Sequence, residues 1–63
     1  MPIMHVFMFE GRTLEQKRKL VANLTEAVVK SLDLKPEAVR ITLFETKKED
    51  MAVGGQLFID KED

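Results

Sequence analysis

The sequence predicts a small α+β protein in which a strand, a helix and a second strand follow one another and the two strands run parallel. Residues 2–9 and 39–46 are apolar runs of strand length, and the segment between them carries apolar residues at helical spacing. A helix of about 19 residues spans roughly 29 Å and a strand of about eight residues roughly 26 Å, so the helix can return along the first strand. A right-handed crossover then brings the second strand beside the first, in a single domain that covers residues 1–63.

Both predicted strands carry apolar residues on more faces than one helix can cover. The two faces of the first strand are Ile3, His5, Phe7 and Phe9 on one side, and Met4, Val6 and Met8 on the other. The faces of the second strand are Val39, Ile41 and Leu43 on one side, and Arg40, Thr42 and Phe44 on the other. The face with Phe44 and one face of residues 2–9 would stay exposed in a monomer, and so small a sheet is not expected to stand alone. We therefore expect the chain to self-associate.

The helix is predicted to begin at Leu14 and to end near residues 32–34. Thr13 is followed three residues later by Gln16, which is the spacing of a capping box. The apolar stripe of the helix consists of Leu20, Val21, Leu24, Ala27, Val28 and Leu32. Pro36 disfavours helical geometry at the residue before it, so the helix must end ahead of that point.

The segment beyond the second strand is predicted to be mostly loop. Residues 47–50 form a charged, solvated loop, and Gly54-Gly55 form a tight turn. Residues 56–59 are a candidate short third strand before the acidic end of the chain.

Composition and charge exclude several classes of function. Ten Lys+Arg stand against eleven Asp+Glu, and this balance argues against binding to nucleic acid or to a membrane surface. Because the chain has no Cys and one His, it has no disulfides, no thiolate zinc site and no cysteine nucleophile. The N-terminal apolar run is shorter than the roughly 18–20 residues of a membrane span, and no basic segment precedes it. We therefore expect a cytoplasmic protein.

Pro2 is a candidate general base. Removal of Met1 before a small residue would leave a secondary amine, held in a ring, at the N-terminus. An α-amino group has a pKa of roughly 7.7–8.0, and nearby cations and desolvation both lower it. The neutral amine could then accept a proton near physiological pH. The alternative is a proline without a chemical role, since proline is a common residue.

Arg12 and Arg40 are candidate anion-binding residues. Arg12 precedes the start of the helix, where the helix dipole is already positive, so a bound carboxylate would offset its charge; otherwise it is a solvated loop residue. Arg40 lies in an apolar strand and either binds an anionic oxygen or faces water. Arg12 lies roughly 25–30 Å from Pro2, whereas Arg40 begins the parallel strand at the Pro2 end. If both arginines serve one substrate, Arg12 must come from a neighbouring subunit.

Pro2, Arg12 and Arg40, with the residues around them, resemble the 4-oxalocrotonate tautomerases, the short-chain type of the tautomerase superfamily. The resemblance covers essentially the full length of the chain. It runs through Pro2-Ile3, Glu10 to Lys17, Ser31-Leu32-Asp33, Val39-Arg40, Glu45 and Gly54-Gly55. Each motif is modest by itself, but their joint spacing in so short a chain is specific.

The resemblance implies a tautomerase-like fold with a C-terminal hairpin, assembled as a homohexamer (a trimer of dimers), and no cofactor or metal. It implies that the Pro2 amine moves a proton in the keto–enol tautomerisation of 2-hydroxymuconate-like dicarboxylates or related 2-oxo acids, products of aromatic-ring degradation. Arg40 would bind the 2-oxygen and its adjacent carboxylate and stabilise the developing dienolate. Arg12 would hold the distal carboxylate. Met51 stands in the site wall where the family usually has Phe.

Two other functions stay open at this point. Hydration or dehalogenation of an unsaturated acid on the same scaffold would need a group that activates water, and His5 is the one candidate. His5 shares a face with Ile3 and Phe7, which is more typical of a core or interface histidine. The second is a catalytically weak or inactive assembly protein with this fold, which Met51 and a retained Met1 would favour. A retained Met1 makes the Pro2 nitrogen an amide that cannot act as a base.

Overall fold

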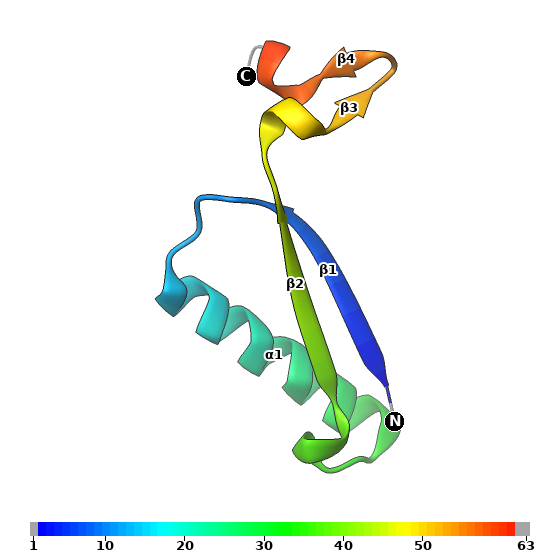
Figure 1. The fold of residues 1–63 in the computed structure, drawn as a ribbon. Helices are drawn as coiled ribbons and strands as arrows, with labels where there is room; N and C mark the ends of the chain where they lie inside the picture. The colour runs from blue at the N-terminus through cyan, green and yellow to red at the C-terminus, as the bar shows by residue number, and fades with distance from the viewer. Residues whose placement is uncertain (1, 62–63) are drawn as a thin grey trace.

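The computed structural model describes residues 2–61 and contains the predicted strand–helix–strand unit (Figure 1). Strand β1 (Ile3–Phe9), helix α1 (Leu14–Leu32) and strand β2 (Arg40–Thr46) follow one another along the chain. A short 3₁₀ turn at Pro36–Ala38 joins α1 to β2. Because β1 and β2 pair in parallel with α1 between them in the chain, the expected α+β class with a strand–helix–strand crossover is confirmed.

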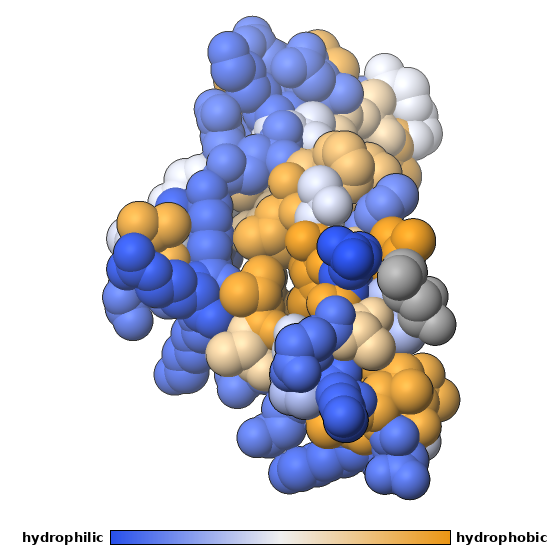
Figure 2. Space-filling model, turned by 60° about the horizontal axis from the view of Figure 1, so that its bottom comes forward, coloured by the Kyte–Doolittle hydropathy of each residue, from blue (hydrophilic) through white to orange (hydrophobic). Residues whose placement is uncertain are grey.

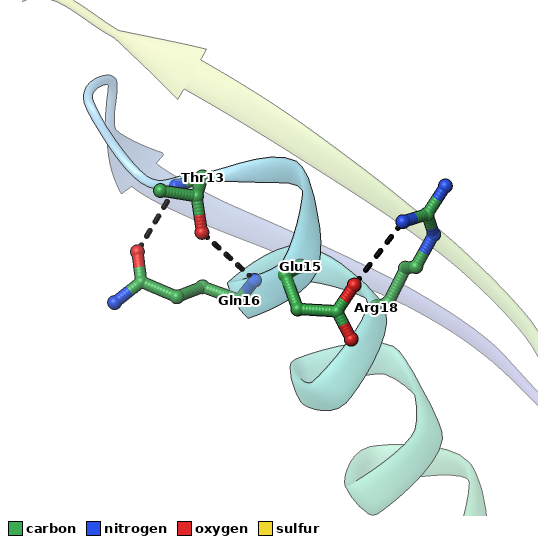
Figure 3. Close-up of polar contacts among 4 residues, drawn as sticks. All are labelled: Thr13, Glu15, Gln16 and Arg18. Atoms are coloured by element: carbon green, nitrogen blue, oxygen red, sulfur yellow. Dashed lines mark hydrogen bonds and ion pairs between the residues drawn. The ribbon is translucent and has the colours of Figure 1, made fainter.

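Helix α1 begins and ends at residues that satisfy its terminal backbone groups, and Figure 3 shows those at its start. The hydroxyl of Thr13 accepts a hydrogen bond from the Gln16 N–H at 3.1 Å, and the Gln16 side-chain oxygen accepts one from the Thr13 N–H at 3.0 Å. Glu15 and Arg18 form a surface ion pair of 3.2 Å in the first turns. At the other end, Asp33 adopts a left-handed conformation with φ of 56° and caps the last turn. The predicted capping box and helix bounds are confirmed.

Helix α1 covers one face of the β1–β2 pair and leaves the other face bare (Figure 1). Half-buried side chains fill the layer between helix and sheet: Met4, Val6, Met8, Ile41 and Leu43 from the strands, and Leu20, Val21, Leu24 and Val28 from the helix. An ion pair of 2.8 Å between Lys17 and Glu45 also ties α1 to β2. No residue in the described range 2–61 is fully buried, so the chain by itself lacks a closed core. Within the same range, no helix is long and apolar enough to cross a membrane.

The bare face of the sheet carries aromatic side chains. Its residues are Ile3, His5 and Phe7 from β1, opposite Arg40, Thr42 and Phe44 from β2, and all six are exposed. The Phe7 and Phe44 rings stack with centroids 4.8 Å apart, although the Phe7 side chain remains 68% exposed. Hydrophobic residues accordingly reach the surface over a broad area of the molecule (Figure 2). The expectation that the Phe44 face stays uncovered in a single chain is confirmed.

A small hairpin follows β2 and projects beyond the end of the parallel pair (Figure 1). Strands β3 (Ala52–Val53) and β4 (Gln56–Leu57) pair antiparallel around Gly54-Gly55. Both glycines have positive φ, 62° and 83°, which is the conformation that a two-residue hairpin turn requires.

The strand predicted at residues 56–59 is wrong in its second half. The Phe58 N–H donates a hydrogen bond of 2.8 Å to the Met51 carbonyl, and the chain then turns into a 3₁₀ turn at Phe58–Asp60. The turn brings the Phe58 ring against Phe9 at a centroid distance of 5.2 Å. This contact fastens the hairpin to β1.

Candidate active site

Pro2 and Arg40 lie together at the end of the sheet where both parallel strands begin. The Arg40 N–H donates a hydrogen bond of 3.2 Å to the Pro2 carbonyl, which continues the strand pairing by one residue. Pro2 is half-buried, whereas Arg40 is exposed and has no carboxylate within 4.0 Å among residues 2–61. A proline ring and an unpaired guanidinium group therefore share this end of the molecule. The fate of Met1, on which the chemistry of the Pro2 nitrogen depends, lies outside the described residues.

Arg12 lies at the opposite end, in the loop that leads from β1 into α1. The loop turns at Gly11, whose φ of 117° favours glycine, and the Thr13 cap follows immediately. In the described part of the chain, Arg12 also has no carboxylate within 4.0 Å. It borders an open cavity of about 240 Å³ whose other lining residues are Met8, Gln16, Lys17 and Leu20. An exposed cation beside a helix N-terminus and an apolar wall is suited to bind a carboxylate.

Met51 lies at the Arg12 end of the sheet as well, because it follows β2. It comes directly after the 3₁₀ turn Lys48–Asp50 and is 36% exposed. The seven residues of β1, at about 3.3 Å each, separate this end from Pro2 by roughly 23 Å. One chain therefore brings Pro2 to Arg40 but brings neither Arg12 nor Met51 to them.

Lys48 is a residue of this end that the sequence analysis did not single out. The segment expected to be a solvated loop forms a 3₁₀ turn, and the Lys48 Nζ lies 6.0 Å from the centre of the Phe9 ring. Lys48 borders a larger open cavity of about 540 Å³ together with Arg12. Residues 47–50 are all charged, so the sequence does not single out Lys48 among them. Its contact with the Phe9 ring in the folded chain does.

The remaining candidate, His5, lies in β1 on the bare face of the sheet, the face that also carries Arg40, and pairs in register with Thr42. Its ring makes an edge contact with Phe44 at a centroid distance of 5.2 Å. Across residues 2–61, the His, Asp and Glu side chains form no group of three or more that could hold a metal ion. The described residues thus place a proline beside an arginine at one end of the sheet, and exposed cations at the other.

Known proteins with similar sequences and structures identify the family. A model of the tautomerase enzyme family matches residues 2–61. The 2-hydroxymuconate tautomerase of Pseudomonas sp. strain CF600 is 41% identical over 56 residues, which are 89% of this chain and 89% of that protein. Among solved structures, a 4-oxalocrotonate tautomerase isozyme of Methylibium petroleiphilum has a TM-score of 0.88 and 48% identity, covering 92% of this chain and 91% of that one. A heterohexamer 4-oxalocrotonate tautomerase from Chloroflexus aurantiacus has a TM-score of 0.90 and 29% identity, with 98% and 100% covered. The chain therefore belongs to the tautomerase family, as an isomerase of the 4-oxalocrotonate tautomerase type.

Proposed function

We propose that the protein catalyses keto–enol proton transfer on 2-hydroxymuconate-like dienol diacids, with the amine of Pro2 as the general base. The observation that carries this proposal is the pairing of Pro2 with Arg40, held by the 3.2 Å backbone hydrogen bond at one end of the sheet. Removal of Met1 frees the ring nitrogen, and a cation close by favours its neutral form. The neutral amine takes the proton of the substrate 2-hydroxyl and returns it to C-3 or C-5, so the net change is an isomerisation.

The other site residues bind and polarise the substrate. Arg40 holds the 2-oxygen and the adjacent carboxylate, where negative charge develops as the dienolate forms. Arg12 holds the distal carboxylate and draws electron density toward it. Met51 supplies an apolar wall that excludes water from the amine, in place of the Phe usual in the family. Degradation of aromatic rings would supply dienols of this class.

The site is proposed to form between copies of the chain, in a homohexamer built as a trimer of dimers. Two features support this assembly: no described residue is buried, and the Phe7–Phe44 stack lies bare on the sheet. The Chloroflexus aurantiacus relative is itself a heterohexamer. Assembly allows Arg12 and Met51 of one copy to approach Pro2 of another, which the length of β1 forbids within one chain.

The test is the ketonisation of 2-hydroxymuconate followed by ultraviolet absorbance. A Pro2→Ala variant should lose about 10²–10⁴-fold in kcat, because a positioned general base contributes that much. Pro36→Ala is the matched control, since Pro36 lies in the 3₁₀ turn before β2 and should leave kcat unchanged. Intact mass should show the loss of one methionine. A Pro2→Ala enzyme as fast as the wild type would refute the role of the amine.

A further inference from the structure

We propose that Lys48 is a second carboxylate-binding residue, which acts with Arg12 to select substrates that carry a carboxylate at the end remote from the reacting oxygen. This inference rests on the proposed function and adds a specificity-determining residue to it. Lys48 does not take part in the proton transfer, and its role is to bind and orient the distal end of the substrate.

The cavity that Lys48 and Arg12 share has the size and charge for such a ligand. It measures about 540 Å³ and is lined by Met8, Phe9, Glu10, Gly11, Arg12 and Lys48. Two cations face one carboxylate, that of Glu10, so the cavity carries a net positive charge. Its apolar lining by Met8 and Phe9 suits the carbon chain of an unsaturated diacid.

Lys48 is held in place by the aromatic contacts beneath it. Its Nζ lies 6.0 Å from the centroid of the Phe9 ring, within the range of a cation–π interaction. The Phe9 ring is in turn held by the edge contact with Phe58 at 5.2 Å and 64°. The turn that carries Lys48 is closed by a hydrogen bond of 2.9 Å from the Asp50 N–H to the Lys47 carbonyl. The ammonium group is therefore positioned before any ligand arrives, which lowers the entropy that binding costs.

The two walls of the cavity are also fixed relative to each other. The Glu10 N–H donates a hydrogen bond of 3.0 Å to the Thr46 carbonyl, which joins the loop after β1 to the end of β2. The Arg12 loop and the Lys48 turn follow directly from these two residues.

The charge of Lys48 is free to meet a ligand. Among residues 2–61, Lys48 has no carboxylate within 4.0 Å, although Glu49 and Asp50 follow it in the chain. Lys17, which borders the smaller cavity beside Arg12, differs because its Nζ lies 2.8 Å from a Glu45 oxygen. Lys17 is thus already neutralised within the chain, and Lys48 is the cation that can assist Arg12.

The experiment compares two substrates that differ only at the distal end. Lys48→Met keeps the length and packing of the side chain and removes its charge. For 2-hydroxymuconate, which has a distal carboxylate, KM should rise about fivefold with kcat unchanged. This is the effect expected when the variant loses one exposed ion pair that stabilises the bound substrate and the transition state equally. For 2-hydroxypenta-2,4-dienoate, which lacks that carboxylate, KM should stay within about twofold of the wild type. Equal increases in KM for both substrates would show a structural role and overturn the inference.

Two variants and a binding measurement complete the test. Lys48→Arg should restore the KM for 2-hydroxymuconate, and Lys47→Met should leave it unchanged, because Lys47 does not line the Arg12 cavity. Calorimetric titration of the assembled protein with adipate, a saturated dicarboxylate, measures binding without catalysis. Adipate should bind Lys48→Met about fivefold more weakly than wild type, and unchanged binding would refute the role of Lys48. If Pro2→Ala is fully active, the proposed function fails, while the adipate result still decides the role of Lys48.

Discussion

The two ends of the β1–β2 pair are built from the same two strands but differ in the contacts that hold their candidate site residues. At the Pro2 end, strand pairing itself fixes the residues, since the Arg40 N–H binds the Pro2 carbonyl. At the far end, Arg12 and Lys48 extend from a loop and a turn, beside open cavities. A proton-transfer group needs exact placement, which strand pairing provides at the Pro2 end. In the proposed function, each chain therefore contributes Pro2 to one site and Arg12 to another.

The largest effect is expected from mixing two inactive variants, which tests whether Pro2 and Arg12 of one site come from different chains. Pro2→Ala and Arg12→Ala should each be nearly inactive alone, because each removes one half of every site. When the two are unfolded together and refolded at equal amounts, about a quarter of the sites should receive an intact Pro2 from one chain and an intact Arg12 from another. Ketonisation of 2-hydroxymuconate should then recover to about a quarter of the wild-type rate.

The control for this mixing experiment is each variant refolded by itself, which should remain inactive. If Pro2 and Arg12 acted within one chain, no mixed assembly would hold both in working form. Absence of recovery in a mixture that has reassembled to wild-type size would therefore contradict the split site.

A charge placed on the bare face of the sheet should prevent assembly, so that Pro2 of one chain can no longer meet Arg12 of another. Phe7 is 68% exposed in the single chain, so Phe7→Glu costs the isolated fold little. In an assembly that covers this face, however, the same carboxylate would be buried without a partner, at a cost of several kcal/mol. We expect analytical ultracentrifugation to show smaller species than the wild type, together with lost activity.

A control variant carries the same added charge on a different surface of the chain, so that any loss of assembly can be assigned to the sheet face. Asn23→Glu adds the same charge on an exposed side of α1 and should leave the assembly intact. Circular dichroism should show the same helix content for both variants. A Phe7→Glu protein that sediments like the wild type would mean that the aromatic face is not an interface.

The sequence was sufficient to predict the parts of the fold that depend on local patterns. The bounds of α1 follow from the Thr13–Gln16 capping box and from Pro36, and the structure has the helix at Leu14–Leu32. The parallel pairing followed from comparing the lengths of helix and strand. The strand expected at 56–59 was shortened because the Phe58 N–H binds the Met51 carbonyl, a contact that no local pattern encodes.

The candidate site was predictable only where it depends on strand direction. Parallel strands start at the same end, so the proximity of Arg40 to Pro2 and the remoteness of Arg12 could both be inferred. The position of Lys48 could not, because it depends on the Phe9 ring, almost forty residues earlier in the chain. Contacts between segments so far apart arise from packing, which periodicity does not report.

The smallest effect is expected from a substitution that weakens the helix cap next to Arg12 and leaves the Pro2 end unchanged. Thr13→Ala removes the hydroxyl that accepts the Gln16 N–H at 3.1 Å and should lower the free energy of unfolding by about 1 kcal/mol. Urea denaturation at one fixed protein concentration measures this, because the stability of an assembly depends on concentration. Thr13→Ser keeps an oxygen acceptor at the cap and should recover most of the loss.

Because Arg12 is the residue next to the cap, KM for 2-hydroxymuconate should rise slightly in Thr13→Ala, while kcat, which depends on Pro2, stays unchanged. A fall in kcat at constant KM would instead mean that the two ends are mechanically coupled through α1.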